Sequence, residues 1–293
     1  MRSKREPGVQ IKTQAQLAKM EEAGQAVASA LRAAADAVAP GVTTADLDAI
    51  ARARIAAAGA APSFLGYHGF PAAICTCVND EIVHGIPSAA RVLREGDVIS
   101  IDCGASVGGW HADAALTVGV PVISAGHARL IADCERALWH GLAAARPGAR
   151  LSDISHAVER SVRAAGEYGI VEDYVGHGIG SEMHMDPPVP NYGRPGRGPV
   201  LAEGMALAIE PLLVLGSPNT RLLDDGWTVV SEDGGWSAHF EHTVAITPDG
   251  PWVLTALTGP PAGVLVPAGI VGAPVIHPLG RAEEPAMYPH AAG

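Results

Sequence analysis

Basic side chains are scarce in this chain of 293 residues. Only 20 Lys and Arg are set against 31 Asp and Glu, so that the formal net charge is −11. This balance argues against a nucleic-acid-binding surface, although bound metal would cancel part of the acidic excess. We therefore expect no nucleic acid substrate.

Long uncharged apolar runs are also missing, which argues against a membrane-spanning helix. The basic residues 1–7 have no apolar segment behind them, so they do not form a secretory signal. The chain has only four cysteines, without the spacing of a disulfide framework or a zinc site: Cys75, Cys77, Cys103 and Cys134. Buried thiols in a reducing compartment are the simplest interpretation, and they predict a cytoplasmic protein with no membrane contact.

Aromatic residues make up only 4% of the chain, whereas hydrophobic residues make up 48%. This composition predicts a globular protein whose core depends on small residues such as Ala and Gly. From residue 259 the chain becomes Pro, Gly and Ala with no clear period. We predict an N-terminal extension (1–10), one globular domain (11–258) and a poorly ordered tail (259–293), in a monomer.

The helical part of the chain repeats itself. Thr13 to Gln16 fits a capping box, and an apolar period from residue 17 to Pro40 predicts a helix, with a second helix up to Gly59. The same design returns 107 positions later, where Pro147–Gly148 match Pro40–Gly41, Asp153–Ile154 match Asp46–Leu47, Val162 matches Ile55 and Gly166 matches Gly59. Two copies are too few for a solenoid. They favour an α+β fold of two pseudo-symmetric halves that share one sheet, with the helices on its outer face.

In two segments the apolar residues follow neither the spacing of a helix nor that of a strand. Residues 181–200 are rich in Pro and Gly and predict a loop, and residues 216–226 predict a turn region.

Four carboxylates and one imidazole end or interrupt strand-like apolar stretches: Asp102, Asp113, His177, Glu210 and Glu241. Such side chains are expected to turn toward the interior, where carboxylates without counter-charge would repel one another and take up protons. Two divalent cations would balance the four negative charges. The pattern therefore predicts a dinuclear metal site that activates a water molecule.

Several motifs together resemble the type I methionine aminopeptidases of peptidase family M24. They lie in residues 65–71, 78–87, 176–180, 209–211, 225–228 and 241–243, and they occur in the order and with the spacing of that family. The resemblance covers residues 11–257. It implies the pita-bread fold, in agreement with the repeat, and removal of the N-terminal methionine from nascent proteins and peptides, with a preference for a small second residue.

The resemblance also implies a role for each residue of the site. Asp102 chelates one metal, Asp113 and Glu241 bridge both, and His177 and Glu210 complete the second. The ions are Co, Mn, Fe, Zn or Ni. His84 and His184 contact the substrate, Glu210 moves the proton, and the methionine pocket is lined by Tyr67, Phe70, Cys75, Met183 and Trp227. Asn79 and Ser237 correspond to a monovalent cation site, and the ribosome surface is an implied partner.

The chain departs from the family pattern at four positions near these motifs: Phe64, Ala114, Met183 and Met185. None is an implied ligand, so we expect effects on rate or metal preference only. We interpret His68, His111, His239 and His242 as satisfied structural histidines, with a role behind the ligands as the alternative.

Three alternatives remain open. The first is another pita-bread peptidase, an X-Pro aminopeptidase or prolidase, but these carry a further N-terminal domain. The second is a binding homologue that has lost catalysis, although such proteins lose ligands and all five are present here. The third is a two-metal phosphoesterase, which would need Lys or Arg near the carboxylates, where almost none occur.

Overall fold

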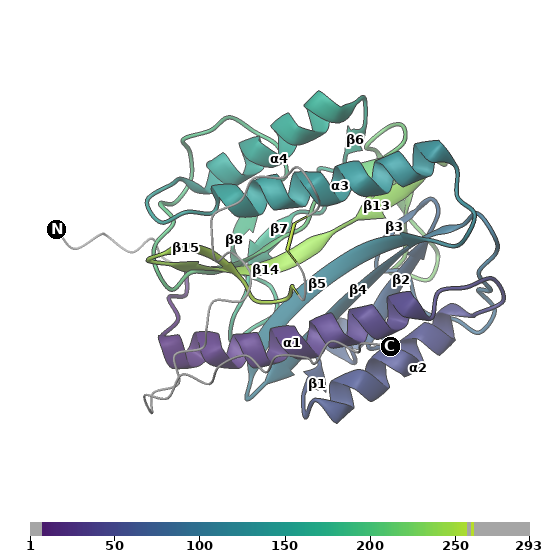
Figure 1. Cartoon of the computed structure of the whole chain (residues 1–293), viewed down its shortest axis with the longest axis horizontal. Coiled ribbons are helices and arrows are strands. Elements are labelled where there is room, and N and C mark those ends of the chain that lie inside the picture. The colour runs from purple at the N-terminus through teal and green to yellow at the C-terminus, as the bar shows by residue number, and fades with distance from the viewer. Residues whose placement is uncertain (1–7, 257–258, 261–293) are drawn as a thin grey trace, which may run out of the picture.

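The computed structural model describes residues 8–256 and 259–260. Within these residues the chain forms four α-helices, fifteen strands and one short 3₁₀ turn, Tyr67–Gly69 (Figure 1). Residues 1–7 of the predicted extension and nearly all of the predicted tail lie outside the described residues.

The four helices form where the sequence predicts them. They are α1 (Gln14–Asp36), α2 (Thr44–Ala57), α3 (Ala125–Ala144) and α4 (Leu151–Ala165). The capping box is confirmed, because the Thr13 hydroxyl accepts a hydrogen bond from the Gln16 amide while the Gln16 side chain accepts one from the Thr13 amide. These bonds satisfy donors that the first helical turn leaves free. No helix among the described residues is both long and apolar enough to cross a membrane.

A nine-stranded antiparallel sheet forms the centre of the fold. Its order is β1-β4-β5-β14-β9-β7-β8, with β2 beside β4 and β15 beside β14. The strands are β1 (Ala61–Pro62), β2 (Ile74–Val78), β4 (Val98–Val107), β5 (Trp110–Gly119), β7 (Gly176–Gly178), β8 (Met185–Val189), β9 (Ala206–Ile209), β14 (Glu241–Thr247) and β15 (Gly250–Val253).

Two three-stranded sheets complete the fold. One has the order β13-β10-β6, made of Ser237–His239, Leu212–Val214 and Gly169–Ile170. The other has the order β11-β12-β3, made of Thr220–Leu222, Val229–Ser231 and Glu81–Val83.

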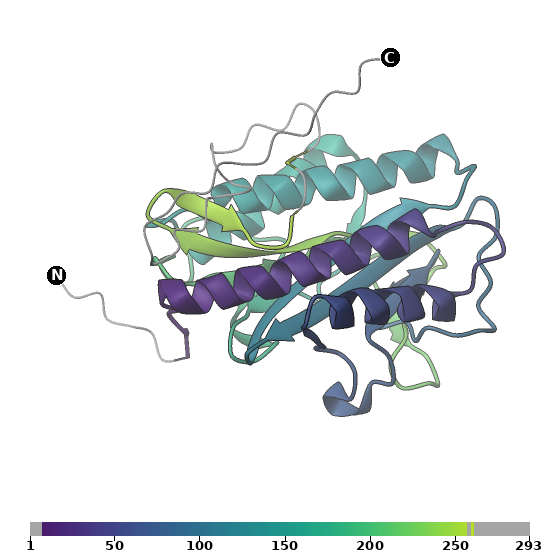
Figure 2. The ribbon, with the colours of Figure 1, turned by 60° about the horizontal axis from the view of Figure 1, so that its bottom comes forward.

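The two halves meet where β5 pairs with β14. Only two residue pairs form this junction, Ala115 with Glu241 and Ala114 with His242. The α1–α2 pair lies against the half that contains β4 and β5, and the α3–α4 pair lies against the other half (Figures 1 and 2). The predicted duplicated α+β architecture, with helices on one face of a shared antiparallel sheet, is confirmed.

Each half has its own apolar core between helices and sheet. In the first half Val27 and Leu31 of α1 and Leu47 of α2 pack with Ile99 and Ile101 of β4. A larger cluster in the second half joins α3 and α4 to β9, β10 and β14, and includes Leu138, Ile154, Val158, Ile209 and Val244. Burial of these side chains holds the strands against the helices. The opposite face of the sheet is therefore a rigid surface on which a site can form.

The loop and turn predictions were wrong in part. The predicted loop 181–200 contains β8, and the predicted turn region 216–226 contains β11. Strand β8 includes Pro187 and Pro188, which a central strand would not tolerate because proline has no N–H to donate. It lies at the edge of the sheet, where that loss is acceptable.

Candidate active site

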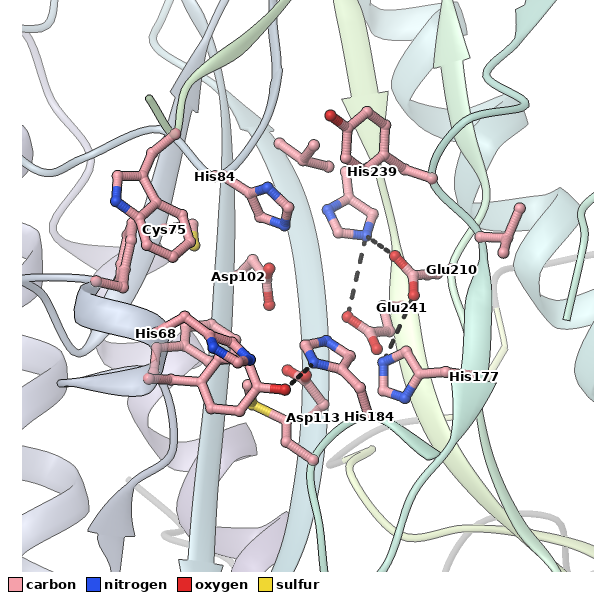
Figure 3. A pocket seen from close by; sticks show the side chains of 18 of the residues that line it. His68, Cys75, His84, Asp102, Asp113, His177, His184, Glu210, His239 and Glu241 are labelled. Carbon is pink, nitrogen blue, oxygen red and sulfur yellow. Dashed lines mark hydrogen bonds and ion pairs between the residues drawn. The ribbon is translucent and has the colours of Figure 1, made fainter. Parts of the chain in front are cut away.

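A cavity of about 450 Å³ is lined by residues from both halves of the chain (Figure 3). Every residue that the sequence assigns to divalent metal, catalysis or the methionine pocket lines it: Tyr67, Phe70, Cys75, His84, Asp102, Asp113, His177, Met183, His184, Glu210, Trp227 and Glu241. The first and last of these residues, Tyr67 and Glu241, are more than 170 positions apart in the sequence, and only the fold brings them to one cavity.

Strand register places three carboxylates on one face. Asp102 of β4 and Glu241 of β14 both pair with Ala115 of β5, one from each side. Asp113 lies two residues before Ala115 on β5. Paired residues and alternate residues of a strand point to the same face of a sheet, so Asp102, Asp113 and Glu241 share that face.

The second half adds His177 and Glu210. His177 lies on β7 opposite Ala208, and Glu210 directly follows the end of β9. His177 Nε2 is 3.6 Å from Glu210 Oε1, and its Nδ1 is 2.9 Å from the carbonyl oxygen of Gly178. Since a carbonyl can only accept, the ring proton is on Nδ1. Nε2 therefore turns a free lone pair toward the carboxylates.

Close strand packing explains the glycines on either side of His177. A Cβ on Gly176 would clash with the carbonyl oxygen of Ala208, and one on Gly178 would clash with that of Asp186. The neighbouring strands β9 and β8 can reach β7 only because both positions lack a side chain.

Burial makes this acidic group costly to ionise. It raises the pKa of Asp102, Glu210 and Glu241 well above the ordinary values, and the charge of Asp113 raises each of them further. Burial also raises the pKa of Asp113, to about 7. Without positive charge nearby, the group would therefore hold protons at neutral pH.

The donor atoms of this group fit divalent cations. Asp102 Oδ1, Asp113 Oδ1 and Glu241 Oε1 are buried and have no hydrogen-bond partner within the described residues. Two sets of three donor atoms lie within 4.8 Å of one another, Asp113–His177–Glu241 and Glu210–His239–Glu241. Asp102 belongs to neither set, although it lines the same cavity. Oxygen donors with imidazole nitrogen suit first-row divalent metals.

The two predicted non-ligand histidines lie on different sides of the cavity. The His184 ring lies 4.4 Å from the His177 ring between centroids, and its Nδ1 is 2.9 Å from the Tyr67 hydroxyl. Burial and the neighbouring His177 lower the pKa of His184 to about 4. The ring is therefore neutral at pH 7. When the Tyr67 hydroxyl donates its hydrogen bond to Nδ1, the ring N–H is on Nε2.

His84 follows strand β3 and has a backbone φ of 60°, which is rare for a residue with a side chain. The ring of Tyr174, which the sequence analysis did not single out, packs edge-on against it with centroids 5.5 Å apart. Burial lowers the pKa of His84, so this imidazole is also neutral at pH 7. Strained backbone held by packing is common at functional sites.

The remaining wall of the cavity is apolar. Phe70, Cys75 and Met183 are buried in one cluster, with Tyr67 and Trp227 packed against it. Phe64 joins this cluster and lines the cavity, as its position beside the pocket motif suggests.

The structure also joins Asn79 and Ser237, but outside the cavity. The Asn79 carbonyl accepts a hydrogen bond of 2.8 Å from the Ser237 amide, and the Ser237 hydroxyl donates to the Glu81 carbonyl at 2.7 Å. Asn79 has a φ of 65°, which turns its carbonyl toward β13. The two residues are neighbours, as the prediction for a monovalent cation requires.

His239 does not fit the first interpretation, that of a satisfied structural histidine. His111 and His242 bond to Ser63 and Thr255, as structural histidines should. The Nε2 of His239, however, is buried without a partner among the described residues, and it faces the carboxylates of Glu210 and Glu241. Burial lowers the pKa of His239 to about 3. His239 ends β13 and Glu241 begins β14, two strands of different sheets, so the two-residue spacing alone could not have placed this ring.

Comparison with known proteins agrees with this geometry. A model of metallopeptidase family M24 matches residues 18–248. Methionine aminopeptidase 1 of Mycobacterium tuberculosis is 54% identical over 241 residues, which are 80% of this chain and 91% of the relative.

Solved structures give the same result. A methionine aminopeptidase from Thermotoga maritima is 41% identical with a TM-score of 0.83, over 84% of this chain and 99% of that one. A prolidase from Pyrococcus furiosus is 23% identical with a TM-score of 0.66, over 85% of this chain but only 66% of its own, and it shares the fold alone. The cavity, the acidic group within it and these matches together show that the chain belongs to metallopeptidase family M24.

Proposed function

We propose that this cavity is the active site of an aminopeptidase that holds two divalent cations and removes N-terminal methionine from nascent proteins and peptides, with a preference for a small second residue. One observation carries the proposal. Four carboxylates and one imidazole border the same cavity as an apolar wall, and buried oxygen atoms of Asp102, Asp113 and Glu241 have no hydrogen-bond partner within the described residues. Relatives at about half identity over most of this chain are named methionine aminopeptidases.

Each ligand has a defined place in this proposal. Asp113 and Glu241 would help to hold both cations, as the family resemblance implies. Asp102 would contribute to holding one of them, and His177 and Glu210 would contribute to holding the other. When bound, such cations would lower the pKa of a coordinated water to about 7 and polarise the carbonyl to be cleaved.

Glu210 moves the proton. Its carboxylate stands between His177 and His239, 3.6 Å and 3.8 Å from their Nε2 atoms, and no side chain among the described residues donates a hydrogen bond to it. A carboxylate that is free to accept can take a proton from the attacking water and pass it to the leaving amine.

His184 stabilises the oxyanion of the tetrahedral intermediate. With Tyr67 bonded to its Nδ1, the N–H on Nε2 is free to donate to the developing negative charge. Because the ring is neutral at pH 7, it donates without bringing a buried positive charge. His84 contacts the substrate from the other side of the cavity, where Tyr174 orients its ring.

The apolar wall selects methionine. Tyr67, Phe70, Cys75, Met183 and Trp227 form a slot in which a thioether can contact aromatic rings. The Phe70 and Trp227 rings are perpendicular to each other, with centroids 5.1 Å apart. The free α-amine of the substrate lies at the acidic group, which restricts cleavage to the first peptide bond.

Several finer points belong to the same proposal. The two cations are drawn from Co, Mn, Fe, Zn and Ni. The domain comprises residues 11–258, a monovalent cation binds at Asn79 and Ser237, and the enzyme is a cytoplasmic monomer that meets nascent chains at the ribosome surface.

An X-Pro aminopeptidase or prolidase activity is the alternative within this fold. The relatives at high identity argue against it, because they are named methionine aminopeptidases. A phosphoesterase is disfavoured because no Lys or Arg lines the cavity in the part of the chain that the structure describes.

The test is reconstitution. Protein stripped of metal is titrated with Mn²⁺, Fe²⁺, Co²⁺ and Zn²⁺, and release of methionine from Met-Ala-Ser and Met-Gly-Met-Met is compared with cleavage of Ala-Pro substrates. We expect no activity without metal, methionine release that saturates at two ions per chain, and no cleavage of Ala-Pro. Cleavage of Ala-Pro, or release without metal, would contradict the proposal.

A further inference from the structure

His239 occupies an unusual place for a buried imidazole. It is 2% exposed, and its Nε2 has no hydrogen-bond partner within the described residues. A buried polar atom without a partner costs free energy, so a residue at such a position is expected to have a partner that completes it. The nearest polar atoms are carboxylate oxygens of Glu210 and Glu241 (Figure 3).

The distances show whether His239 Nε2 and the carboxylate oxygens are joined by a hydrogen bond or are spaced to bind one cation. His239 Nε2 lies 3.8 Å from Glu210 Oε2 and 3.9 Å from Glu241 Oε2, and both separations are too long for a hydrogen bond. Two atoms that bind one ion at about 2.1 Å each can lie up to about 4.2 Å apart. Both distances are within that limit.

His177 provides an internal comparison. Its Nε2 is 3.6 Å from Glu210 Oε1, nearly the same separation, and the family resemblance makes His177 a ligand. The imidazole of His177 thus lies near one oxygen of the Glu210 carboxylate, and the imidazole of His239 lies near the other. The difference is that Nδ1 of His177 is bonded to a backbone carbonyl.

We propose that His239 is a further protein ligand, through Nε2, for the cation that Glu210 holds. The inference rests on the proposed function, since it assumes that the acidic group binds cations. It deepens that function by giving the site two nitrogen donors instead of one. Nitrogen donors favour Co²⁺, Ni²⁺ and Zn²⁺ over Mn²⁺, so His239 would set part of the metal preference of the enzyme.

The experiment compares full-length wild type with His239→Leu and His239→Gln. Leu removes all polarity, whereas Gln keeps an N–H donor but lacks an imidazole nitrogen. His242→Gln is the control, because His242 is half-buried and bonds to Thr255 instead of facing the carboxylates. Circular dichroism confirms that each variant is folded.

Two measurements are made on protein titrated with Co²⁺. Calorimetry gives the affinity of each equivalent, and proton NMR counts the histidine rings whose resonances are shifted far downfield by a direct bond to cobalt. We expect two such rings in wild type and in His242→Gln, and one ring in both His239 variants. We also expect one equivalent to bind at least about tenfold more weakly in both His239 variants.

Some outcomes overturn the assignment. One shifted ring in wild type, or unchanged affinity in both His239 variants, would show that His239 is not a ligand. Wild-type affinity in His239→Gln alone would show that an imidazole nitrogen is not needed at this position, which also contradicts the assignment. If wild type binds no Co²⁺ at all, the proposed function fails. This result can be told apart from failure of the His239 assignment alone, in which wild type still binds Co²⁺.

Discussion

Replacing Asp113 by Asn should stabilise the metal-free protein at pH 8 and destabilise the metal-loaded one. The reason lies in the position of Asp113, which is 3% exposed and surrounded by other carboxylates. Its pKa is raised by burial from 3.8 to about 7. The folded state thus binds the proton more tightly than the unfolded state does.

The sign of the pH dependence follows directly. A carboxyl group with a raised folded pKa contributes stability below its unfolded pKa, and this contribution is lost as the pH rises through the folded pKa. For Asp113 the window extends from pH 3.8 to about 7. At pH 8 the metal-free protein carries the full cost of a buried charge, and at pH 4 it carries almost none.

The magnitude follows from the size of the shift. Each pKa unit corresponds to about 1.36 kcal/mol, so the change from 3.8 to about 7 costs roughly 4 kcal/mol at pH 8. Asn has nearly the same shape and no charge, so it removes up to this cost. In a domain of this size the gain corresponds to an increase in Tm of roughly 8–16 °C.

The assay is thermal unfolding, followed by tryptophan fluorescence, in EDTA and in excess Mn²⁺ at pH 4 and pH 8. We expect Asp113→Asn to raise Tm in EDTA at pH 8, to leave it nearly unchanged at pH 4, and to lower it in Mn²⁺, because a ligand is lost. Asp36→Asn, at an exposed position at the end of α1, is the control and should change none of these values. The reasoning is refuted if Asp113→Asn fails to raise Tm in EDTA at pH 8, or raises it equally at both pH values.

Three further variants test other parts of the site. Glu210→Gln should lower kcat by about 10²–10⁴-fold without lowering the Tm of the metal-free protein, and turnover near wild type would remove its role in proton transfer. Tyr67→Phe removes the partner of His184 Nδ1, so steady-state kinetics should show a kcat about tenfold lower with little change in KM; a change in KM alone would contradict this role. Gly178→Ala should lower stability by about 2 kcal/mol or more in urea titrations, because its Cβ would clash with Asp186, and an unchanged midpoint would show that β8 can move away.

Local chemistry made much of this fold predictable. The first helix begins at Thr13 because its hydroxyl and the Gln16 side chain satisfy the free amides nearby, and both partners lie within four residues. The repeat of Pro, Gly and Asp at a constant spacing predicted two similar halves, since each copy encodes the same pair of helices. Carboxylates at the ends of apolar stretches predicted an acidic site, because interior charge needs compensation.

The sequence did not indicate which strands lie at the edge of a sheet. Pro187 and Pro188 are typical of a loop, and they form a strand only because β8 pairs on one side and needs no donor on the other. Likewise β11 forms at residues 220–222 because β12 lies beside it.

The sequence by itself determined which residue types are present, and its family resemblance indicated their roles. Only the tertiary structure decided which atoms meet. Tyr67 and His184 are 117 positions apart, and only the folded chain brings the Tyr67 hydroxyl within hydrogen-bond distance of His184 Nδ1. The position of His239 depends on the pairing of β13 with β10, in which His239 lies opposite Leu212, and its buried Nε2 faces Glu210 and Glu241. Long-range register is set by the packing of the whole core, and no short segment encodes it.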